Sequence, residues 1–344
     1  MAGVESVRPT IRDVATAAGV SPATVSLALN GRGTISVATT ARVREVAERM
    51  GYRPSRTARA LRTARTATLA LVLSTIDPAH DGGGEPSFEY YMRLTRGAAS
   101  AAFAREHRLL IAPPVRSGAE LADLGVDGAI VCDPRPADPQ LDLFAEHGVP
   151  VVTIEADPQR PAFDWHANSD NASSMRLLLE HLAGAGARRI ALVAPAWPMA
   201  WAVESVAAYR AWCAEHGFPE LLDTGASGPP FVDAAAERAG ALLDLPDPPD
   251  AIVGMVERFA AGVLGAARRR GLDVPGDLLV ASAMDSAECR EGATPITAID
   301  LDPDGLGQAA IDLLLARIRG EDAPRPVLVP VALRTRASTA RDRD

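Results

Sequence analysis

The sequence predicts a small all-α head followed by a larger body of two α/β subdomains, each built on a parallel sheet. Residues 10–30 contain two short helical patterns joined by a glycine. After residue 68, short uninterrupted apolar runs alternate with longer helical patterns, which is typical of parallel sheets covered on both faces. The charge changes there too. Residues 1–68 carry eleven arginines and four carboxylates, while the whole chain of 344 residues has a net charge of −9.

Suitable residues stand at the ends of the two short helices. Thr10 is a good N-cap, and Asp13 three residues later completes a capping box. Gly19 supplies the left-handed conformation that ends the first helix. Ser21 caps the second helix and Pro22 takes its first position, where no backbone donor is needed. A helix end and a new cap so close together predict a sharp corner.

A third helix, capped by Ser36 and ended by Gly51, completes the predicted head. The residues expected in its core are Ile11, Val14, Ala15, Val25, Ala28, Leu29, Val43, Val46, Ala47 and Met50. The outward face of the second helix then holds Ala23, Leu27 and Asn30, flanked by Thr24 and Ser26. This arrangement indicates a helix-turn-helix, whose second helix enters the major groove of DNA. The alternative is a small helical bundle with no such purpose.

The charge distribution favours the DNA-binding interpretation. Residues 1–68 have a net charge of +7, so the rest of the chain has a net charge of −16. Arginines neutralise phosphates and release counterions, whereas an acidic body is repelled by nucleic acid.

The segment after the head carries Arg53, Arg56, Arg59, Arg62 and Arg65, one at every third position around an apolar leucine. By composition alone this is a solvated basic linker. From Thr10 to Pro54, however, the chain resembles the lactose-repressor (LacI/GalR) family of transcription regulators in its TIRDVA, AGVS, TVS, LNG and GYxP patterns.

That resemblance extends to a hinge helix at 55–67, because Ala58-Arg59-Ala60-Leu61 is similar to the family's Ala-Arg-x-Leu pattern. It implies that Leu61 is a wedge inserted into the minor groove at the centre of a pseudo-palindromic operator. The roughly eight residues from Ser55 to Arg62 are too few for a stable isolated helix in water. We therefore expect the hinge to order only against DNA and a partner copy.

The residues expected to contact DNA are Thr10, Ser21, Ala23, Thr24, Ser26, Leu27, Asn30, Arg32, Arg56, Arg59, Leu61 and Arg62. Two positions depart from the family pattern. Leu27 and Thr40 stand where many members carry arginine. Leu27 cannot read guanine through two hydrogen bonds, although with Ala23 it can touch thymine methyl groups. The operator sequence therefore does not transfer from relatives.

The body is predicted from alternating strands and helices. Apolar strand-like runs occur at 69–73, 109–112, 129–131, 149–154, 190–193, 251–254 and 278–281. Helical patterns between them occur at 92–105, 173–182, 203–215 and 259–270. No run reaches the roughly 20 apolar residues of a membrane helix, and residues 1–9 contain no signal-peptide core, so we expect a cytoplasmic protein. Widely spaced Cys132, Cys213 and Cys289 are expected to be buried free thiols.

Body segments also resemble the family, among them VDGAIV, GVPVVTI, HLAGAGARRIALV, PPDAIV, GLDVPGDLLV and LRTRAST. The resemblance implies a periplasmic-binding-protein-like body. Its domains would be a head at 8–54, the hinge at 55–67 and an effector-binding and dimerisation domain at 68–340. The N-subdomain would span 68–164 and 295–322, and the C-subdomain 165–291 and 326–340, with crossovers near 164–168, 285–295 and 321–326.

The effector cleft would lie beyond the carboxyl ends of the strands. Resemblance aligns Asp285 with a family acid that binds sugar hydroxyls, but places Ser205 where the family has a ligand-gripping arginine and Val256-Glu257 where it has Asn-Asp. The expected effector contacts are Tyr90, Tyr91, Trp165, Trp201, Ser205, Glu257 and Asp285, with Glu204 and Trp197 as further candidates. For each aromatic the alternative is an ordinary core position. A sugar or other polyhydroxylated effector fits these residues.

An enzyme and a transport protein are the two alternative classes. An enzyme would need a catalytic motif, and the chain has no G-x-G-x-x-G after a strand, no G-x-S-x-G, no H-E-x-x-H, no paired cysteines and no lysine. A solute-binding transport protein would share the body but needs an export signal and lacks the head. We therefore predict a homodimeric, sequence-specific repressor without a cofactor, metal or membrane partner, whose ligands are operator DNA and a small effector.

Leu61→Ala is predicted to weaken binding to the operator more than binding to random DNA, because a wedge acts only where the duplex is kinked. Competition binding with both kinds of DNA measures this. Equal losses on the two DNAs would remove Leu61 from the minor groove.

Overall fold

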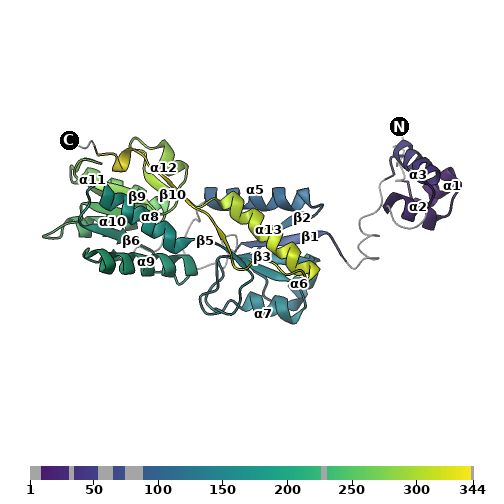
Figure 1. The fold of residues 1–344 in the computed structure, drawn as a ribbon, viewed down its shortest axis with the longest axis horizontal. Coiled ribbons are helices and arrows are strands. Elements are labelled where there is room, and N and C mark those ends of the chain that lie inside the picture. Colours follow the sequence, from purple (N-terminus) through teal and green to yellow (C-terminus); the bar gives the residue numbers. More distant parts are fainter. Residues whose placement is uncertain (1–8, 31–34, 53–64, 74–87, 226–230, 342–344) are drawn as a thin grey trace, which may run out of the picture. The chain divides into compact units, whose positions relative to one another are not determined.

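A computed structural model describes residues 9–30, 35–52, 65–73, 88–225 and 231–341. The chain forms two compact units, residues 1–66 and 67–344 (Figure 1). The first unit is the head and the second the body. Apart from residues 65–67, the predicted hinge at 55–67 lies outside the described residues.

The head contains the three predicted helices, α1 (Ile11–Ala18), α2 (Pro22–Asn30) and α3 (Val37–Arg49). All the predicted core residues belong to one apolar cluster, in which Val14, Val25 and Val43 are completely buried. Gly19 has φ 66°, the left-handed conformation predicted for the end of α1. The sequence prediction of the head is therefore confirmed in its helices, its caps and its core.

The body folds into two lobes, each centred on a mostly parallel sheet. The sheet of the first lobe has the order β11-β5-β4-β3-β1-β2 and is parallel throughout. Its elements are β1 (Thr68–Leu73), α5 (Phe88–Ala104), β2 (Arg108–Ala112), α6 (Gly118–Leu124), β3 (Gly128–Cys132), α7 (Pro139–Glu146), β4 (Val151–Ile154), β5 (His166–Ser169), α13 (Pro303–Arg319) and β11 (Val327–Val329).

The sheet of the second lobe has the order β12-β10-β9-β8-β6-β7, with β12 antiparallel to β10 and the other pairs parallel. Its elements are α8 (Asn171–Gly184), β6 (Ile190–Val193), α9 (Ala200–His216), β7 (Leu221–Asp223), α10 (Phe231–Leu243), β8 (Ala251–Gly254), α11 (Glu257–Arg269), β9 (Leu279–Ser282), α12 (Ala287–Glu291), β10 (Thr297–Asp300) and β12 (Ala332–Arg334).

Each sheet is covered on both faces, as the uninterrupted apolar runs predict. In the first lobe, α5 and α13 cover one face, and α6 and α7 pack on the other (Figure 1). In the second lobe, α8 and α9 cover one face, and α10 and α11 the other. The three cysteines are free and buried, as predicted. Among the described residues, no helix combines the length and the hydropathy needed to cross a bilayer.

The sequence prediction missed the strands β5, β7, β10, β11 and β12. The clearest case is β5, whose four residues His-Ala-Asn-Ser are mostly polar. It pairs with β4 on one side and with β11 on the other, so tertiary pairing rather than hydropathy makes it a strand.

The chain passes between the lobes three times, at positions that differ from the predicted crossovers. Because β5 belongs to the first sheet, the first crossing follows Ser169 rather than lying at 164–168. The second lies at 301–302, between β10 and α13, and not at 285–295. The third lies at 330–331, between β11 and β12, and not at 321–326. In each case the strand completes its pairing before the chain leaves its sheet.

All three crossings start at the carboxyl end of a strand, namely β5, β10 and β11. Since neighbouring strands run parallel, the carboxyl ends of each sheet lie along one edge. The crossings therefore bring the carboxyl edges of the two sheets together. In α/β proteins this is the edge where ligands bind.

Close packing of α5 against α13 is set by two glycines. A methyl group on Gly97 would overlap the carbonyl oxygen of Asp304, and one on Gly307 would overlap that of Leu94. We expect Gly307→Ala to lower the free energy of unfolding by about 1–3 kcal/mol, because rigid backbone blocks the added methyl group. Urea denaturation of the full chain measures this.

Gly184 at the end of α8 is the matched control, since a methyl group there meets no atom within 4 Å. Gly184→Ala should leave stability unchanged or raise it by about 0.4–1 kcal/mol. Equal effects of the two substitutions would show that the crossing tolerates a side chain.

Candidate nucleic-acid interface and effector cleft

Capping bonds fix the corner between α1 and α2. The Thr10 amide donates to Asp13 Oδ2 at 2.7 Å, and the Asp13 amide donates to Thr10 Oγ1 at 3.4 Å. The Thr10 amide and the Thr10 hydroxyl both donate to the Asp13 carboxylate, and these two bonds lower its pKa. At α2, Ser21 Oγ accepts the Thr24 amide at 3.1 Å. Thr10, Ser21 and Thr24 therefore position the helices, whatever contacts they also make with DNA.

The predicted outward face of α2 is exposed. Leu27 is 43% exposed and Ala23 is also exposed, while Thr24 and Ser26 are half-buried beside them. Asn30 is the last residue of α2. The remaining predicted DNA contacts, Arg32, Arg56, Arg59, Leu61 and Arg62, lie outside the described residues.

On the first lobe, the carboxyl edge is lined by two tyrosines and two acids. Tyr90 and Tyr91 meet edge to face, with ring centroids 5.2 Å apart. Tyr91 donates its hydroxyl to Asp133 Oδ2 at 2.6 Å. Asp133 directly follows β3, and Glu155 directly follows β4. Burial raises the pKa of Asp133 to about 6, against the hydrogen bond from Tyr91, and raises that of Glu155 to about 8.

On the second lobe, the predicted residues follow strands in the same way. Trp201 and Ser205 lie in the first turns of α9, where Trp201 meets Trp197 edge to face at 5.9 Å and Ser205 is buried. Glu257 is buried at the start of α11, after β8. Asp285 follows β9. The structure thus brings these residues to one edge of the second sheet.

Asn171 joins the two lobes at this edge. Its side-chain amide donates to Glu155 Oε2 at 2.8 Å and to Glu204 Oε2 at 3.0 Å. Glu155 belongs to the first lobe and Glu204 to α9 of the second, while the Ser169 amide also donates to Glu155 at 3.0 Å. One amide thus holds acids from both lobes within hydrogen-bond reach.

Asp285, predicted to bind effector, is held by arginines. Arg336 donates two hydrogen bonds to its carboxylate, at 2.9 and 2.7 Å, and Arg290 lies 3.6 Å away. Only 6% of the Asp285 side chain is exposed, against 16% for Arg336. The acid therefore joins the segment after β12 to the second sheet.

Trp165 is not brought to the carboxyl edge, contrary to the prediction. It precedes the first residue of β5 and therefore lies at the opposite end of that strand from Ser169. The guanidinium groups of Arg317 and Arg325 lie 5.0 and 4.6 Å from its ring centroid. Cation–π stacking with these two arginines accounts for the position of Trp165.

The sequence interpretation missed Asp133, Glu155 and Asn171 as cleft residues. A usable signal was present, because Asp133 and Glu155 each stand immediately after an apolar strand and Asn171 follows β5 closely. Since parallel strands align their carboxyl ends, the residue after each strand is a candidate for the same site.

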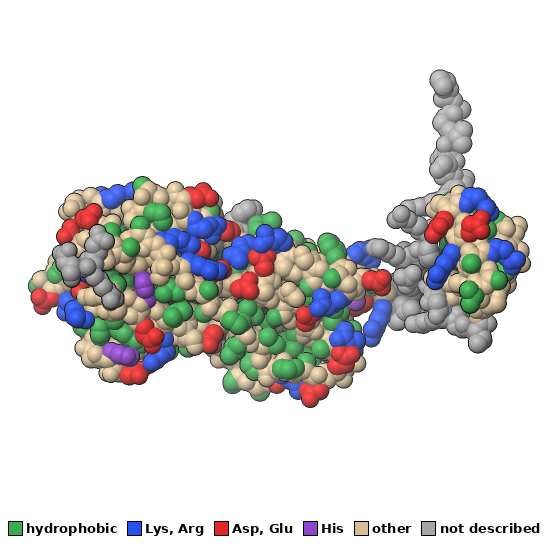
Figure 2. Space-filling view, turned by 45° about the horizontal axis from the view of Figure 1, so that its top comes forward, with side chains coloured by type: hydrophobic (Ala, Val, Ile, Leu, Met, Phe, Trp, Pro, Cys, Tyr) green, Lys and Arg blue, Asp and Glu red, His purple; other side chains and the backbone are tan. Residues whose placement is uncertain are grey.

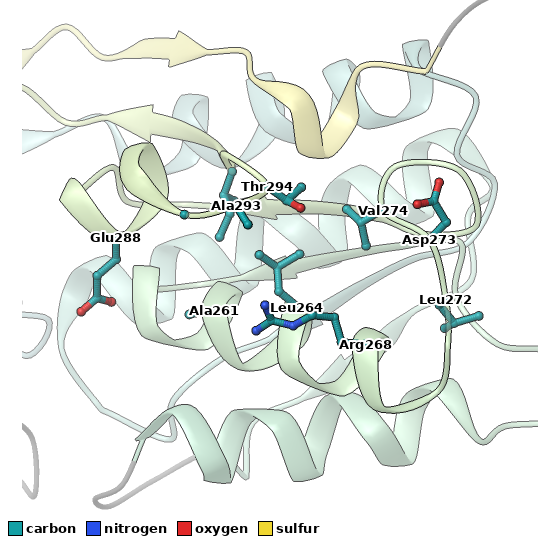
Figure 3. A pocket seen from close by; sticks show the side chains of 11 residues that line it. Ala261, Leu264, Arg268, Leu272, Asp273, Val274, Glu288, Ala293 and Thr294 are labelled. Carbon is teal, nitrogen blue, oxygen red and sulfur yellow. The ribbon is translucent and has the colours of Figure 1, made fainter.

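A separate pocket lies on the outer side of the second lobe, between α11 and the segments at 272–274 and 288–296 (Figure 3). Its volume is about 280 Å³, and its lining includes Leu264, Arg268, Val274 and Glu288. None of the seven predicted effector residues lines it. The predicted site is therefore a different one, at the carboxyl edges.

A helical head with an exposed reading helix, joined to a two-lobed α/β body, defines a ligand-controlled DNA-binding regulator. Residues 10–55 match the family described as bacterial regulatory proteins of the lacI family, and residues 179–339 match the periplasmic binding protein-like domain. The HTH-type transcriptional regulator CelR of Thermobifida fusca is 30% identical over 326 residues, which cover 91% of this chain and 93% of CelR. The chain belongs to the lacI family of bacterial transcriptional regulators.

Solved structures agree with this assignment. A transcriptional regulator CelR–cellobiose complex is similar with a TM-score of 0.66 and 28% identity, covering 96% of this chain and 100% of that chain. The lac repressor dimer bound to operator and an anti-inducer has a TM-score of 0.79 at 22% identity, covering 97% and 99%. At 22% identity, the similarity to the lac repressor shows a shared fold only.

Breaking the Asp285–Arg336 pair should destabilise the body. We expect Asp285→Asn to lower the free energy of unfolding by about 3 kcal/mol, because a mostly buried guanidinium loses its counter-charge. Urea denaturation measures the change. Asp142→Asn is the control, since Asp142 pairs with Arg160 but its side chain is 58% exposed. Similar losses of stability in both variants would show that the Asp285–Arg336 pair contributes no more than an exposed ion pair.

The raised pKa of Glu155 predicts a pH-dependent stability. The folded state holds the proton more tightly than the unfolded state, so this contribution is complete below about pH 4.5 and is lost as the pH rises through about 8. The side chain of Glu155→Gln cannot ionise. From pH 5.5 to pH 8.5, the free energy of unfolding should therefore fall less in this variant than in the native chain, and the two losses should differ by more than about 1 kcal/mol.

Urea titrations at the two pH values give this difference directly. Glu146→Gln, at an exposed position of α7, removes the same charge and should behave like the native chain. An unchanged pH dependence in Glu155→Gln would show that this carboxyl titrates normally.

Proposed function

We propose that this regulator is a repressor that binds a pseudo-palindromic operator as a homodimer, and that a small polyhydroxylated effector between its two lobes controls that binding. The observation that carries the proposal is that one chain combines the meeting of both carboxyl edges at Asn171 with an exposed α2 reading face on a separate unit. A ligand at that edge touches both lobes, so it can change the angle between them.

The DNA-binding half of the proposal rests on the head. Its core and caps hold α2 with Ala23 and Leu27 outward, and neither residue can donate hydrogen bonds from its side chain. We propose that these two residues contact thymine methyl groups, and that the other predicted residues position the head on phosphates or bases. The lac repressor, which has a similar fold, was solved as a dimer bound to operator, and this supports two half-sites.

The effector half rests on the carboxyl edges. Tyr90, Tyr91, Trp201, Ser205 and Glu257 all lie there, so we retain them as proposed effector contacts. Asp285 is retained as well, at the margin of the site, with Arg336 as its partner. A relative was solved with cellobiose, which supports a carbohydrate-like ligand.

Besides the bonds of Asn171, partly exposed ion pairs link the two lobes in the part of the chain that the structure describes. Glu89 of α5 pairs with Arg290 of α12 at 2.6 Å, and Arg93 of α5 lies 3.3 Å from Asp300 at the end of β10. Figure 2 shows arginine and acidic side chains next to one another over the middle of the body. Partly exposed pairs contribute at most about 1 kcal/mol each. A ligand shifts the angle only by the difference between its affinities for the two arrangements, and a preference of roughly 30-fold, about 2 kcal/mol, offsets two such pairs.

We further propose that the protein acts in the cytoplasm, where the chromosome is, and that it catalyses no reaction. The support for both is the family, which consists of DNA-binding regulators.

Selection from a random duplex pool by the full-length protein tests the proposed function. The expected result is an enriched pseudo-palindrome with a flexible central step, whose binding changes when cellobiose and other neutral saccharides are added one at a time. If the selection enriches no sequence under any condition, the proposal is contradicted.

Leu27→Ala should weaken binding to the selected operator by about 1–2 kcal/mol, because apolar contact with a base methyl group is lost. Binding to random DNA should not change. Leu27→Met keeps the apolar volume and should retain most of the affinity. Fluorescence anisotropy with both DNAs measures the difference, and equal behaviour of the two variants would remove Leu27 from the reading face.

A further inference from the structure

Three carboxylates converge in the cleft and are called here the acidic cluster: Asp133, Glu155 and Glu204. They come from the ends of β3 and β4 and from α9. Glu155 is 3% exposed, and the charges of Asp133 and Glu204 act on it directly. The cluster therefore brings negative charge from both lobes to one place.

Its hydrogen-bond donors are neutral. Asn171 serves Glu155 and Glu204, the Ser169 amide serves Glu155, and Tyr91 serves Asp133. Neutral donors satisfy oxygen atoms but supply no positive charge. The three acids repel one another, and this repulsion adds to burial in raising the pKa of Glu155.

Among the described residues, the groups that shift the pKa of Asp133 and Glu155 include no arginine. Arg336 and Arg290 lie against Asp285, and Arg93 pairs with Asp300 and Asp304. Of the body segments outside the described residues, 74–87 and 226–230 contain neither arginine nor lysine, and 342–344 contains Arg343. A cationic ligand would therefore meet Asp133 and Glu155 without a competing arginine among these groups.

A second observation points to a ligand at the same place. Ser169, at the carboxyl end of β5, is 2% exposed, and its hydroxyl has no hydrogen-bond partner. Side chains alternate along a strand, so Ser169 shares a face with Ala167, which packs in the same cluster as Tyr90. The hydroxyl therefore faces the side of the sheet where the tyrosines lie, beside Glu155. Buried hydroxyls are normally bonded, and a ligand would satisfy this one.

An organic cation fits this place better than a metal ion. Among the residues that the structure describes, no group of three or more His, Cys, Asp or Glu side chains has the arrangement needed to hold a metal ion. The neighbouring wall is aromatic, with Tyr90 and Tyr91 edge to face at 5.2 Å and Trp201 on the other lobe. Aromatic faces attract ammonium groups, and acids bind them by charge-assisted hydrogen bonds.

We propose that the effector is a polyhydroxylated amine whose protonated nitrogen binds to the acidic cluster, with Ser169 and the tyrosines contacting its hydroxyl-bearing part. This inference rests on the proposed function, because it names the class of ligand for that same cleft. Anionic ligands such as phosphorylated sugars are excluded by the same charge.

Bound ammonium would favour the ionised cluster. Burial raises the pKa of Glu155 to about 8, so this acid is mostly protonated at pH 7 in the empty cleft. The titratable groups that face it are Asp133, Glu204 and Tyr90. A cation placed among them lowers the pKa of Glu155, so binding releases a proton.

Calorimetry of the full-length protein with two matched disaccharides tests this inference. The probes are cellobiose and the β-1,4-linked disaccharide of glucosamine, which carries ammonium in place of a hydroxyl on each ring. At pH 6.5, the aminated disaccharide should bind at least tenfold more tightly. Its binding heat should differ between phosphate and imidazole buffers because a proton is released, whereas the heat for cellobiose should not differ.

Two variants connect the preference to the cluster. Glu155→Gln and Glu204→Gln should each reduce the preference for the amine at least fivefold, and Glu155→Gln should also abolish the dependence of the heat on buffer. Glu146→Gln removes the same charge from an exposed part of the first lobe and should change neither.

Equal affinity for the two disaccharides, tighter binding of cellobiose, or binding of neither overturns the inference. Operator selection on the same protein preparation keeps the two proposals apart. An enriched operator without a preference for the amine leaves the regulator intact and removes only the cationic effector. Failure of the selection contradicts the proposed function itself.

Discussion

The body depends on one constraint, which is that the chain leaves a sheet only at the carboxyl end of a strand. The crossings after Ser169, after Asp300 and after Val329 all obey it. As a result the carboxyl edges of both sheets are tied together. The cleft is thus a consequence of topology before any side chain is considered, and side chains decide only what it binds.

Residues at the carboxyl edge of the first sheet lower the stability of the folded chain, and this cost is expected of a binding site. Asp133 and Glu155 both adopt left-handed backbone, with φ of 49° and 65°, a conformation that costs non-glycine residues about 1–2 kcal/mol. Burial of Glu155 beside two other acids adds an electrostatic cost. Ala67, Glu106, Ala137 and Asp302 share this conformation, whereas Gly19, Gly125 and Gly217 take the left-handed positions at helix ends. At the cleft, a ligand would supply interactions that offset the strain of Asp133 and Glu155.

Much of the fold was predictable because the decisive signals are local. Caps such as Thr10 and Ser36 and the apolar periodicity of α2 and α3 act within a few residues of sequence, and the head follows from them. The apolar strands β1, β3, β6 and β8 are likewise recognisable one by one. By contrast, β5 has no apolar run and exists because β4 and β11 pair with it from distant parts of the chain. Missing that strand displaced the first predicted crossover.

The candidate site shows the same division. The sequence by itself determined the class of protein, the helix-turn-helix and several residues that follow strands, because these depend on local pattern and on resemblance. Only the tertiary structure decided that Trp165 stacks under Arg317 and Arg325, that Asp285 is held by Arg336, and that Asn171 joins Glu155 to Glu204. These partners are separated by between 16 and 160 positions in the chain, and Asp285 and Arg336 by 51. A local sequence pattern does not predict such contacts, because they form only when the two sheets have folded and their carboxyl edges meet.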